Sequence, residues 1–550
     1  MPILLALLLS AGAVSPRGAV ATAHPIASEA AVRVLRGGGN AVDAAVAAAF
    51  ALSIVEPQAS GIGGGGFALV YLARTGEIHA LDFREVAPAA ARADLFADAG
   101  DGTARPSLDG GLAVAVPGAV KGYAELARRF GTRPLAVLVE PAVEAAEKGF
   151  TVGPAYAEDA RAREACLASR PAAARELLVP RDGRRVAPAP GDRIVRRDLA
   201  RTLRQLGRDP DAFYRGPLAQ RIARAARADG GILTAADLAR YRVRERVTVE
   251  GRYRGHRVVS MGLPSSGGAI LIGLLQALER EDPRAGGYRP PRFLHAMVEL
   301  EKRLYASRAL LGDPDFAKDA AGVVAEMVSP AAATRLAGGI GERATPAAEV
   351  APPRDGRHTT HLSVVDREGN GVALTTTVND LFGACVVVPG TGILLDDEMD
   401  DFDAAPGVPN AYGLVGTGAN APAPDKTPLS SMAPTLVFDP AGELWLVVGA
   451  PGGATIPTTV AQVISHLVDD GMTTAQALAA PRLHHQWQPD AIRLEPNALE
   501  VETARALEAR GHRLAVAERP WGNAQAVRRR EDGLWEGASD PRCDGVALAP

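Results

Sequence analysis

The sequence predicts an α+β protein, because helical and strand-like segments both recur along the chain. Residues 41–55 form a run of small apolar residues, almost uncharged after Asp43, which is typical of a helix buried against a sheet. Residues 354–379 contain two short segments rich in Val, Thr and Leu around a polar turn at 367–371, which predicts paired strands. Residues 134–309 are mainly amphipathic helical segments, interrupted by the strand-like residues 247–261.

Composition bounds the class of protein. The chain has 550 residues, of which 47% are hydrophobic and 23% charged, as in ordinary globular proteins with a large core. The formal net charge is −4 and no long run of one sign occurs. This balance argues against nucleic acid as a partner.

Three cysteines occur, at positions 166, 385 and 543. They are widely separated, form no CxxC motif and have no zinc-type spacing with histidine, so a disulfide framework is excluded. A single bridge is not excluded, but buried or inert thiols are the favoured interpretation.

The N-terminus carries a short apolar segment, residues 3–14, with small residues near its end at 11–13 that form a possible cleavage site. The segment is too short to cross a bilayer and fits the apolar region of a secretory signal. The first residues contain no Lys or Arg, and a mis-assigned start or a short buried segment is the alternative. We predict a signal peptide over residues 1–17 and a periplasmic or secreted protein.

Several common site signatures are absent or weak. Four glycines at 63–66 run into a strand without the GK[ST] of a phosphate loop, which indicates close backbone approach instead. There is no HExxH or GxSxG motif, and the adjacent His484 and His485 favour packing over metal binding. The acidic run at 396–401 lacks the spacing of a calcium loop and on composition alone resembles a solvated turn.

Residues 331–353 are expected to form a surface loop.

Two adjacent threonines, Thr359 and Thr360, stand where loop-like sequence becomes strand, and a second cluster, 375–377, lies on the returning strand. A hydroxyl is a poor nucleophile unless a base is held beside it, and an N-terminal threonine supplies its own α-amine. That arrangement requires a cut between His358 and Thr359. The sequence therefore points to self-cleavage at this bond.

Many collinear motifs carry a resemblance to one family. They are GGNAVDAAVA from 38, GGGGF from 63, DFREVAP from 82, PSSGG from 264, LGDPDF from 311, TTHLSVVD from 359, MDDF from 399, PLSSM from 428 and APGG from 450. On these motifs the chain resembles the gamma-glutamyltranspeptidases (glutathione hydrolases), which are N-terminal nucleophile hydrolases. The resemblance implies a four-layer αββα sandwich that cleaves itself into a large fragment, 18–358, and a small catalytic fragment, 359–550. The two fragments are expected to form a heterodimer that needs no metal or organic cofactor.

The resemblance also implies roles for individual residues. Thr359 is the nucleophile, Thr377 contacts it, and the backbone N–H groups of Gly452 and Gly453 form the oxyanion hole. The donor's α-carboxylate is expected to bind Arg84, Ser430 and Ser431, and its α-amine Asn379, Glu398 and Asp401. The loop at 404–427, which contains Tyr412, resembles the lid over the glutamyl pocket.

The implied reaction is transfer of a γ-glutamyl group from glutathione and related compounds to water, amino acids or peptides. One alternative is a glutaryl or cephalosporin acylase of the same fold, and another is an unprocessed, inactive binding protein. A glutaryl substrate has no α-amine for Glu398 and Asp401 to bind. These acids therefore favour the γ-glutamyl enzyme.

Overall fold

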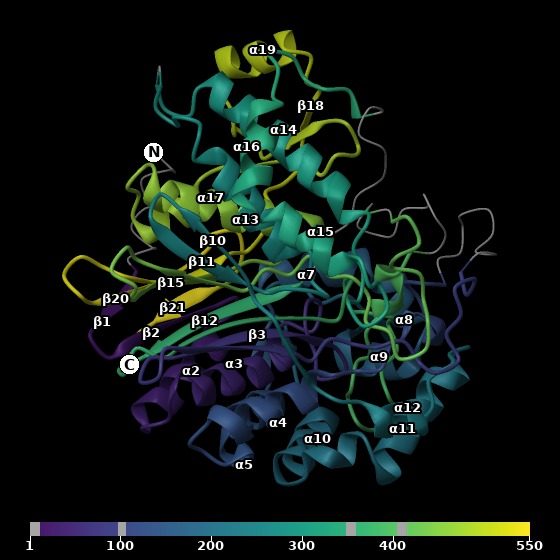
Figure 1. Cartoon of the computed structure of the whole chain (residues 1–550). Coiled ribbons are helices and arrows are strands. Elements are labelled where there is room, and N and C mark those ends of the chain that lie inside the picture. Colours follow the sequence, from purple (N-terminus) through teal and green to yellow (C-terminus); the bar gives the residue numbers. More distant parts are fainter. Residues whose placement is uncertain (1–11, 97–105, 286, 348–358, 404–413, 415) are drawn as a thin grey trace.

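Two seven-stranded sheets lie face to face, and helices cover both outer surfaces (Figure 1). The computed structural model describes residues 12–96, 106–285, 287–347, 359–403, 414 and 416–550. Over these residues the arrangement is the predicted four-layer αββα sandwich, which is confirmed.

The first sheet contains the hairpin that begins at Thr360. In spatial order its strands are β21 (Val546–Leu548), β2 (Gly18–Thr22), β12 (Thr360–Asp366), β13 (Gly371–Thr377), β3 (Gly65–Leu72), β4 (Glu77–Asp82) and β9 (Arg244–Arg246). The second sheet contains, in spatial order, β1 (Ala13–Ser15), β20 (Trp535–Ser539), β19 (Gln525–Arg529), β15 (Leu444–Gly449), β14 (Thr435–Phe438), β11 (His256–Ser260) and β10 (Val249–Tyr253). Three small sheets pair β5 (Phe150–Thr151) with β8 (Arg193–Ile194), β6 (Val179–Arg181) with β7 (Arg184–Val186), and β17 (Ile492–Leu494) with β16 (Leu483–His484) and β18 (Leu514–Val516).

The helices divide by chain order between the two outer layers. Those of the first half share an apolar core with the first sheet: α2 (Pro25–Arg36), α3 (Ala41–Val55), α4 (Ala119–Phe130), α5 (Leu135–Leu138), α6 (Glu140–Lys148), α7 (Pro154–Ala162), α8 (Glu164–Ala168), α9 (Pro171–Leu177), α10 (Arg197–Arg208), α11 (Gly216–Ala228) and α12 (Ala235–Arg240). Those of the second half share a core with the second sheet: α13 (Gly267–Leu278), α14 (Pro291–Arg308), α15 (Ala320–Met327), α16 (Pro330–Gly338), α17 (Ile456–Val468), α18 (Thr474–Ala479) and α19 (Val501–Ala509).

Strand β12 separates these two cores through the alternation of its side chains. Leu362 and Val364 belong to the core under the helices of the first half, whereas Val365 belongs to the core between the sheets. Helix α3 packs against this strand and is buried along its whole length, as its apolar sequence predicts. Its start is fixed by a capping box in which Asn40 and Asp43 exchange side-chain-to-backbone hydrogen bonds.

The glycine run at 63–66 lies where backbone segments approach closely, which confirms the prediction. A Cβ atom on Gly64 would overlap the carbonyl oxygen of Thr377, and one on Gly63 would overlap that of Leu394. The run therefore lets β3 and its preceding loop pack directly against the end of β13.

Two local expectations were wrong. Residues 330–338 form helix α16 rather than a loop, because Ser329 caps its N-terminus by accepting a hydrogen bond from the Ala332 N–H and Pro330 suits the first helical position. The apolar neighbours of Arg84 in residues 80–90 predict that it lies within a strand, but strand β4 ends at Asp82 and Arg84 lies just beyond it.

The interpretation of the cysteines as inert thiols was also wrong for two of them. Cys166 and Cys385 form a disulfide, and Cys543 is the free thiol. The two partners are 219 residues apart, so only the packing of α8 against the loop after β13 brings them together.

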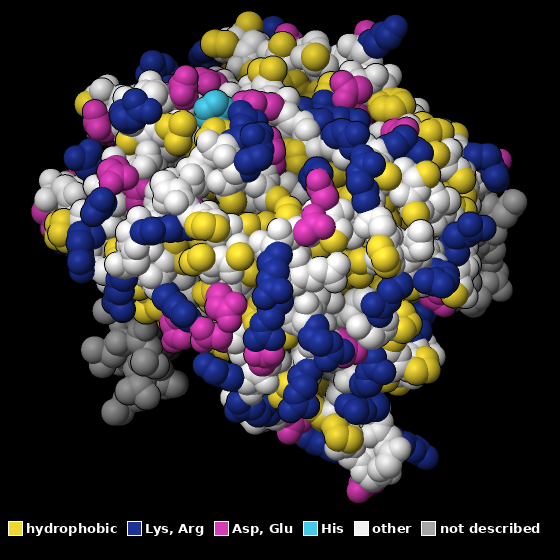
Figure 2. Space-filling view, turned by 90° about the horizontal axis from the view of Figure 1, so that it is seen from below, with side chains coloured by type: hydrophobic (Ala, Val, Ile, Leu, Met, Phe, Trp, Pro, Cys, Tyr) yellow, Lys and Arg dark blue, Asp and Glu magenta, His cyan; other side chains and the backbone are white. Residues whose placement is uncertain are grey.

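The outer face formed by α4, α5 and α10 carries mixed charge. Figure 2 shows Lys and Arg side chains spread among acidic and apolar ones over the face that lies at the bottom of Figure 1. Ion pairs made by these helices include Arg204 with Glu147 and Arg128 with Glu125. Among the described residues, no helix is both long and apolar enough to cross a membrane.

Candidate active site

Thr359 stands at the first position before β12, a central strand of the first sheet. In the β12–β13 register Thr360 pairs with Thr376, so the next pair along is Thr359 and Thr377. Thr359 is 7% exposed and lines two cavities. The predicted hairpin is confirmed, and it places the two threonine clusters opposite each other.

A small cavity of about 20 Å³ gathers most of the predicted site residues around Thr359. Their common feature is a polar or charged side chain, or a glycine, at the end of a strand or in the loop that follows. Those lining the cavity are Arg84, Thr359, Thr377, Asn379, Glu398, Asp401, Ser430, Ser431 and Gly453. His358 and Tyr412, also predicted to belong to the site, lie outside the described residues.

Opposite charges meet directly inside this cavity. The buried Arg84 guanidinium forms ion pairs with Glu398 through Nη1 and with Asp401 through Nη2, and Glu85 lies 3.8 Å from Nη1. Burial raises the pKa of Glu398 and of Asp401, although the positive charge of Arg84 acts to lower both. Burial alone would lower the pKa of Arg84, but Glu398 and Asp401 raise it above its ordinary value.

The acidic run at 396–401 is buried, so the expectation of a solvated turn was wrong. Backbone N–H groups stabilise it from within: the Asp396 carboxylate accepts from Ala115 and Glu398, each at 2.9 Å, and the Asp397 carboxylate accepts from Asp380 at 2.9 Å. These bonds fix a 3₁₀ turn, Glu398–Asp401, that directs Glu398 and Asp401 toward Arg84.

Asn379 is held in a conformation that few residues other than glycine adopt. Its φ is +75°, its N–H donates to Thr377 Oγ1 at 2.8 Å, and its Nδ2 donates to the Asp397 carbonyl at 3.0 Å. The backbone N–H therefore ties Asn379 to the threonine pair, and its side chain ties it to the acidic turn.

The serine pair is supported by the 264–268 loop. Ser265 forms a bridge with Ser430, and the Ser266 N–H donates to the Ser430 carbonyl at 2.9 Å. Within the described part of the chain, the buried Ser431 Oγ has no hydrogen-bond partner. A buried hydroxyl without a partner is costly, and at the wall of a cavity it is available to a ligand.

Gly452 and Gly453 form the turn between β15 and α17. Their φ angles, +131° and +54°, lie in the region that favours glycine, and a Cβ on Gly452 would collide with Thr455 Oγ1. Gly453 lines the small cavity and Gly452 a larger one, so Thr359 borders both beside this turn.

A larger cavity, of about 510 Å³, also borders Thr359. Its wall includes residues that the sequence did not indicate, among them Glu56, Glu158, Asp159, Arg519 and Asn523. No motif joins them, because they come from α7, the end of α3 and the loop before β19.

Glu56 is an acidic residue of this wall that contacts the start of β12. Thr360 Oγ1 donates to Glu56 Oε2 at 2.7 Å. Loss of water around the carboxyl raises the pKa of Glu56 to about 8, and the nearby Asp159 and Asp544 add to the shift. The group is therefore largely protonated at neutral pH.

This shift predicts a pH-dependent stability. The pKa of Glu56 is about 8 in the folded chain and 4.5 in the unfolded chain. Its contribution to the free energy of unfolding is therefore fully present below pH 4.5 and is lost as the pH rises through 8. We expect Glu56→Gln to gain stability relative to the parent chain across this window. Urea unfolding at several pH values measures it, and a difference that stays constant from pH 4.5 to 8 would contradict the assignment.

The sequence is similar to that of known proteins along nearly its whole length. The family model described as Gamma-glutamyltranspeptidase matches residues 27–549. A glutathione hydrolase proenzyme of Escherichia coli (strain K12) is 41% identical over 534 residues, which is 96% of this chain and 90% of that protein.

Solved structures are similar as well. A cephalosporin acylase from Bacillus halodurans matches with a TM-score of 0.84 and 29% identity, over 98% of this chain and 97% of that one. A Helicobacter pylori gamma-glutamyltranspeptidase chain matches with a TM-score of 0.56 and 38% identity, over 60% of this chain and 93% of that one. The protein whose fold and site are described above therefore belongs to the gamma-glutamyltranspeptidase family.

Proposed function

We propose that the protein is a gamma-glutamyltransferase and glutathione hydrolase that becomes active by cutting itself before Thr359. The observation that carries this proposal is the content of the small cavity beside Thr359. It combines a guanidinium, two serine hydroxyls and two carboxylates. These groups complement a zwitterionic α-amino acid whose side-chain carbonyl reaches the threonine.

Self-cleavage would begin with attack of Thr359 Oγ1 on the carbonyl carbon of His358. The C–N bond breaks, the acyl group moves from nitrogen to oxygen, and the amide nitrogen becomes the free α-amine of Thr359. Water then hydrolyses the ester and releases the His358 carboxylate. The products are a large fragment that ends at His358 and the small fragment 359–550, and the H. pylori match over 60% of this chain supports a separate large fragment.

In the mature enzyme the α-amine of Thr359 acts as the base. With an intrinsic pKa of roughly 7.7–8.0 it is partly neutral near pH 7 and takes the proton from Oγ1. The hydroxyl attacks the γ-carbonyl, and the N–H groups of Gly452 and Gly453 stabilise the oxyanion. The proton passes to the leaving nitrogen, and a γ-glutamyl ester remains on Thr359 until water or an acceptor amine attacks it.

The charges of the small cavity explain how the donor would be oriented. The α-carboxylate binds Arg84, Ser430 and Ser431. A carboxylate can accept two parallel hydrogen bonds from the Arg84 guanidinium. The α-amine binds Asn379, Glu398 and Asp401. Donor charges thus replace the direct ion pairs that Arg84 forms with the two acids.

A direct comparison of substrates tests the function. γ-Glutamyl-p-nitroanilide carries the α-amine and glutaryl-p-nitroanilide lacks it, while both present a carboxylate to Arg84. We expect a higher kcat/KM for the γ-glutamyl compound. Preference for the glutaryl compound would instead support an acylase, and no turnover of either compound would support an inactive binding protein.

The larger cavity is suited to the leaving group and the acceptor. It borders Thr359 but is lined by none of the predicted donor-binding residues, and Arg519, paired there with Glu158, offers a cation for a peptide carboxylate. We expect Arg519→Ala to raise the KM for a dipeptide acceptor several-fold, with little change in hydrolysis of the donor. Transpeptidation assays at varied acceptor concentration measure this.

Arg505, exposed on α19 and absent from the wall of this cavity, provides a matched control. Arg505→Ala should leave acceptor kinetics unchanged. If Arg519→Ala behaves in the same way, the acceptor does not bind through Arg519.

The protein is also proposed to be exported. A signal peptide within residues 1–17 would direct the protein to the periplasm or the medium, and the pairing of Ala13–Ser15 with β20 favours removal before Ala13. The N-terminal sequence of the exported large fragment tests this. A fragment that begins at Gly18 would lack β1 and would contradict removal of the signal before Ala13.

A further inference from the structure

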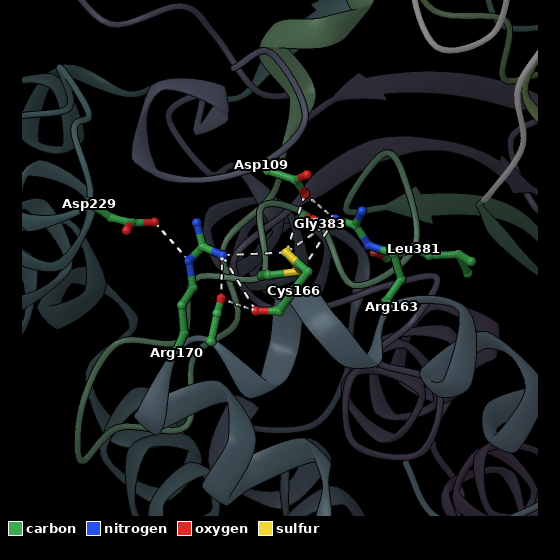
Figure 3. Close-up of a disulfide and its surroundings, with 9 residues drawn as sticks. Asp109, Arg163, Cys166, Arg170, Asp229, Leu381 and Gly383 are labelled. Carbon is green, nitrogen blue, oxygen red and sulfur yellow. Dashed lines mark hydrogen bonds and ion pairs between the residues drawn. A yellow bond between two sulfur atoms is a disulfide. The ribbon is translucent and has the colours of Figure 1, made fainter. Parts of the chain in front are cut away.

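The disulfide between Cys166 and Cys385 joins two parts of the chain that the proposed cut would separate. Cys166 lies on α8 (Figure 3), and Cys385 lies in the loop that follows β13. Their Cα atoms are 6.2 Å apart, within the range of protein disulfides. Cys166 belongs to residues 18–358 and Cys385 to residues 359–550.

We propose that this bond covalently links the two fragments after self-cleavage, so that the mature enzyme is a disulfide-linked heterodimer. The inference rests on the proposed cut before Thr359. The bond forms when the two thiols lose two electrons and two protons to a thiol–disulfide oxidase of the exporting compartment. An exported protein meets such conditions, whereas a cytosolic one is kept reduced.

Two arginines surround the sulfur atoms. Arg163 Nη2 lies 3.3 Å from Cys385 Sγ and 3.7 Å from Cys166 Sγ, and Arg170 Nη1 lies 3.4 Å from Cys166 Sγ. Arg170 is held by Asp229 at 2.9 Å, and Arg163 also pairs with Asp109 (Figure 3). These cations favour a thiolate at either position when the bond is opened.

The geometry also sets the course of reduction. Cys166 is half-buried and Cys385 fully buried, so a small-molecule thiolate reaches the Cys166 sulfur first. It forms a mixed disulfide with Cys166 and expels the Cys385 thiolate beside Arg163. A second thiolate then attacks the small molecule's sulfur, which frees the Cys166 thiolate and yields the oxidised small molecule.

A metal site is the competing interpretation of the same residues. Asp109, Cys166 and Cys385 offer ligand atoms that all lie within 4.8 Å of one another. Two guanidinium groups within 3.7 Å of the sulfurs oppose a further cation there. The local charge therefore favours the disulfide.

The bond also anchors a loop of the donor site. Residues 379–385 run from Asn379 to Cys385, and Arg163 Nε donates to the Leu381 carbonyl at 3.1 Å along the way. At the other end, Asn379 Nδ2 donates to the Asp397 carbonyl. Opening the bond releases one of the two ends of the loop that positions Asn379, and we expect a several-fold rise in the donor KM.

Denaturing gels of the exported protein test the link. Free thiols are blocked with N-ethylmaleimide, and samples are run with and without dithiothreitol. We expect two bands with reductant and one band near the full-length mass without it. Cys166→Ser should give two bands in both lanes, whereas Cys543→Ser, which changes the free thiol, should behave like the parent protein.

The gels separate this inference from the proposed cleavage. Two bands without reductant would overturn the link and leave the cleavage intact. One band with reductant would overturn the cleavage, and a non-reduced digest would still decide whether peptides containing Cys166 and Cys385 are joined. N-ethylmaleimide on both cysteines, or a stoichiometric metal found by elemental analysis, would overturn the disulfide itself.

Discussion

Thr359→Ala is expected to remain a single uncut chain without measurable transferase or hydrolase activity. The change removes the hydroxyl that attacks the His358 carbonyl, and without the cut no α-amine forms to act as the base. Loss of a nucleophile that acts as a unit with its base costs roughly 10⁴-fold or more in rate. Reducing gels and hydrolysis of γ-glutamyl-p-nitroanilide measure the two effects.

Two matched variants isolate the role of this hydroxyl. Thr359→Ser keeps a hydroxyl and should still be cut. Thr360→Ala removes the neighbouring hydroxyl, which donates to Glu56, and should also be cut before Thr359. Normal cleavage of Thr359→Ala would refute the assignment of the nucleophile.

Asp401→Asn is expected to raise the KM for γ-glutamyl donors roughly tenfold to a hundredfold. The variant keeps the size of the side chain but removes the charge that pairs with the α-amine, and hydrogen bonds to charged groups contribute roughly 1.5–3 kcal/mol. The KM for a glutaryl anilide should stay the same or fall, because Arg84 loses a competing carboxylate. Steady-state kinetics with both anilides measure this contrast.

Asp403→Asn is the matched control for this variant. Asp403 is a buried acid two residues away that accepts from the Gly418 N–H at 3.3 Å and does not line the small cavity. Its change should leave the KM for both anilides nearly unaltered. Equal effects of Asp401→Asn on the two substrates would remove Asp401 from recognition of the α-amine.

The sequence predicted those parts of the site that lie at the ends of regular elements. The β12–β13 hairpin follows from two Val- and Thr-rich segments around a polar turn, and this pairing alone sets Thr359 opposite Thr377. The close approach at Gly64 followed from a glycine run without phosphate-loop features. Collinear motifs then indicated which separated loops meet.

The features that the sequence did not predict depend on tertiary contacts that no local pattern encodes. Five acidic residues within a run of six suggest a solvated turn, but the 396–401 run is buried and stabilised by backbone N–H donors and Arg84. Glu56 follows an apolar helix and gains its role only from the cavity beside Thr360. Cys166 and Cys385 are distant in sequence, and their pairing depends on how α8 packs against a loop of the first sheet.

Intact mass spectrometry of the reduced, purified protein tests the central claim most directly. We predict two species: one beginning at Thr359 and ending at Pro550, and one ending at His358. Their summed mass should equal that of the uncut chain plus one water. A single uncut species, or a cut at any other bond, would contradict the proposal that Thr359 is the N-terminal nucleophile.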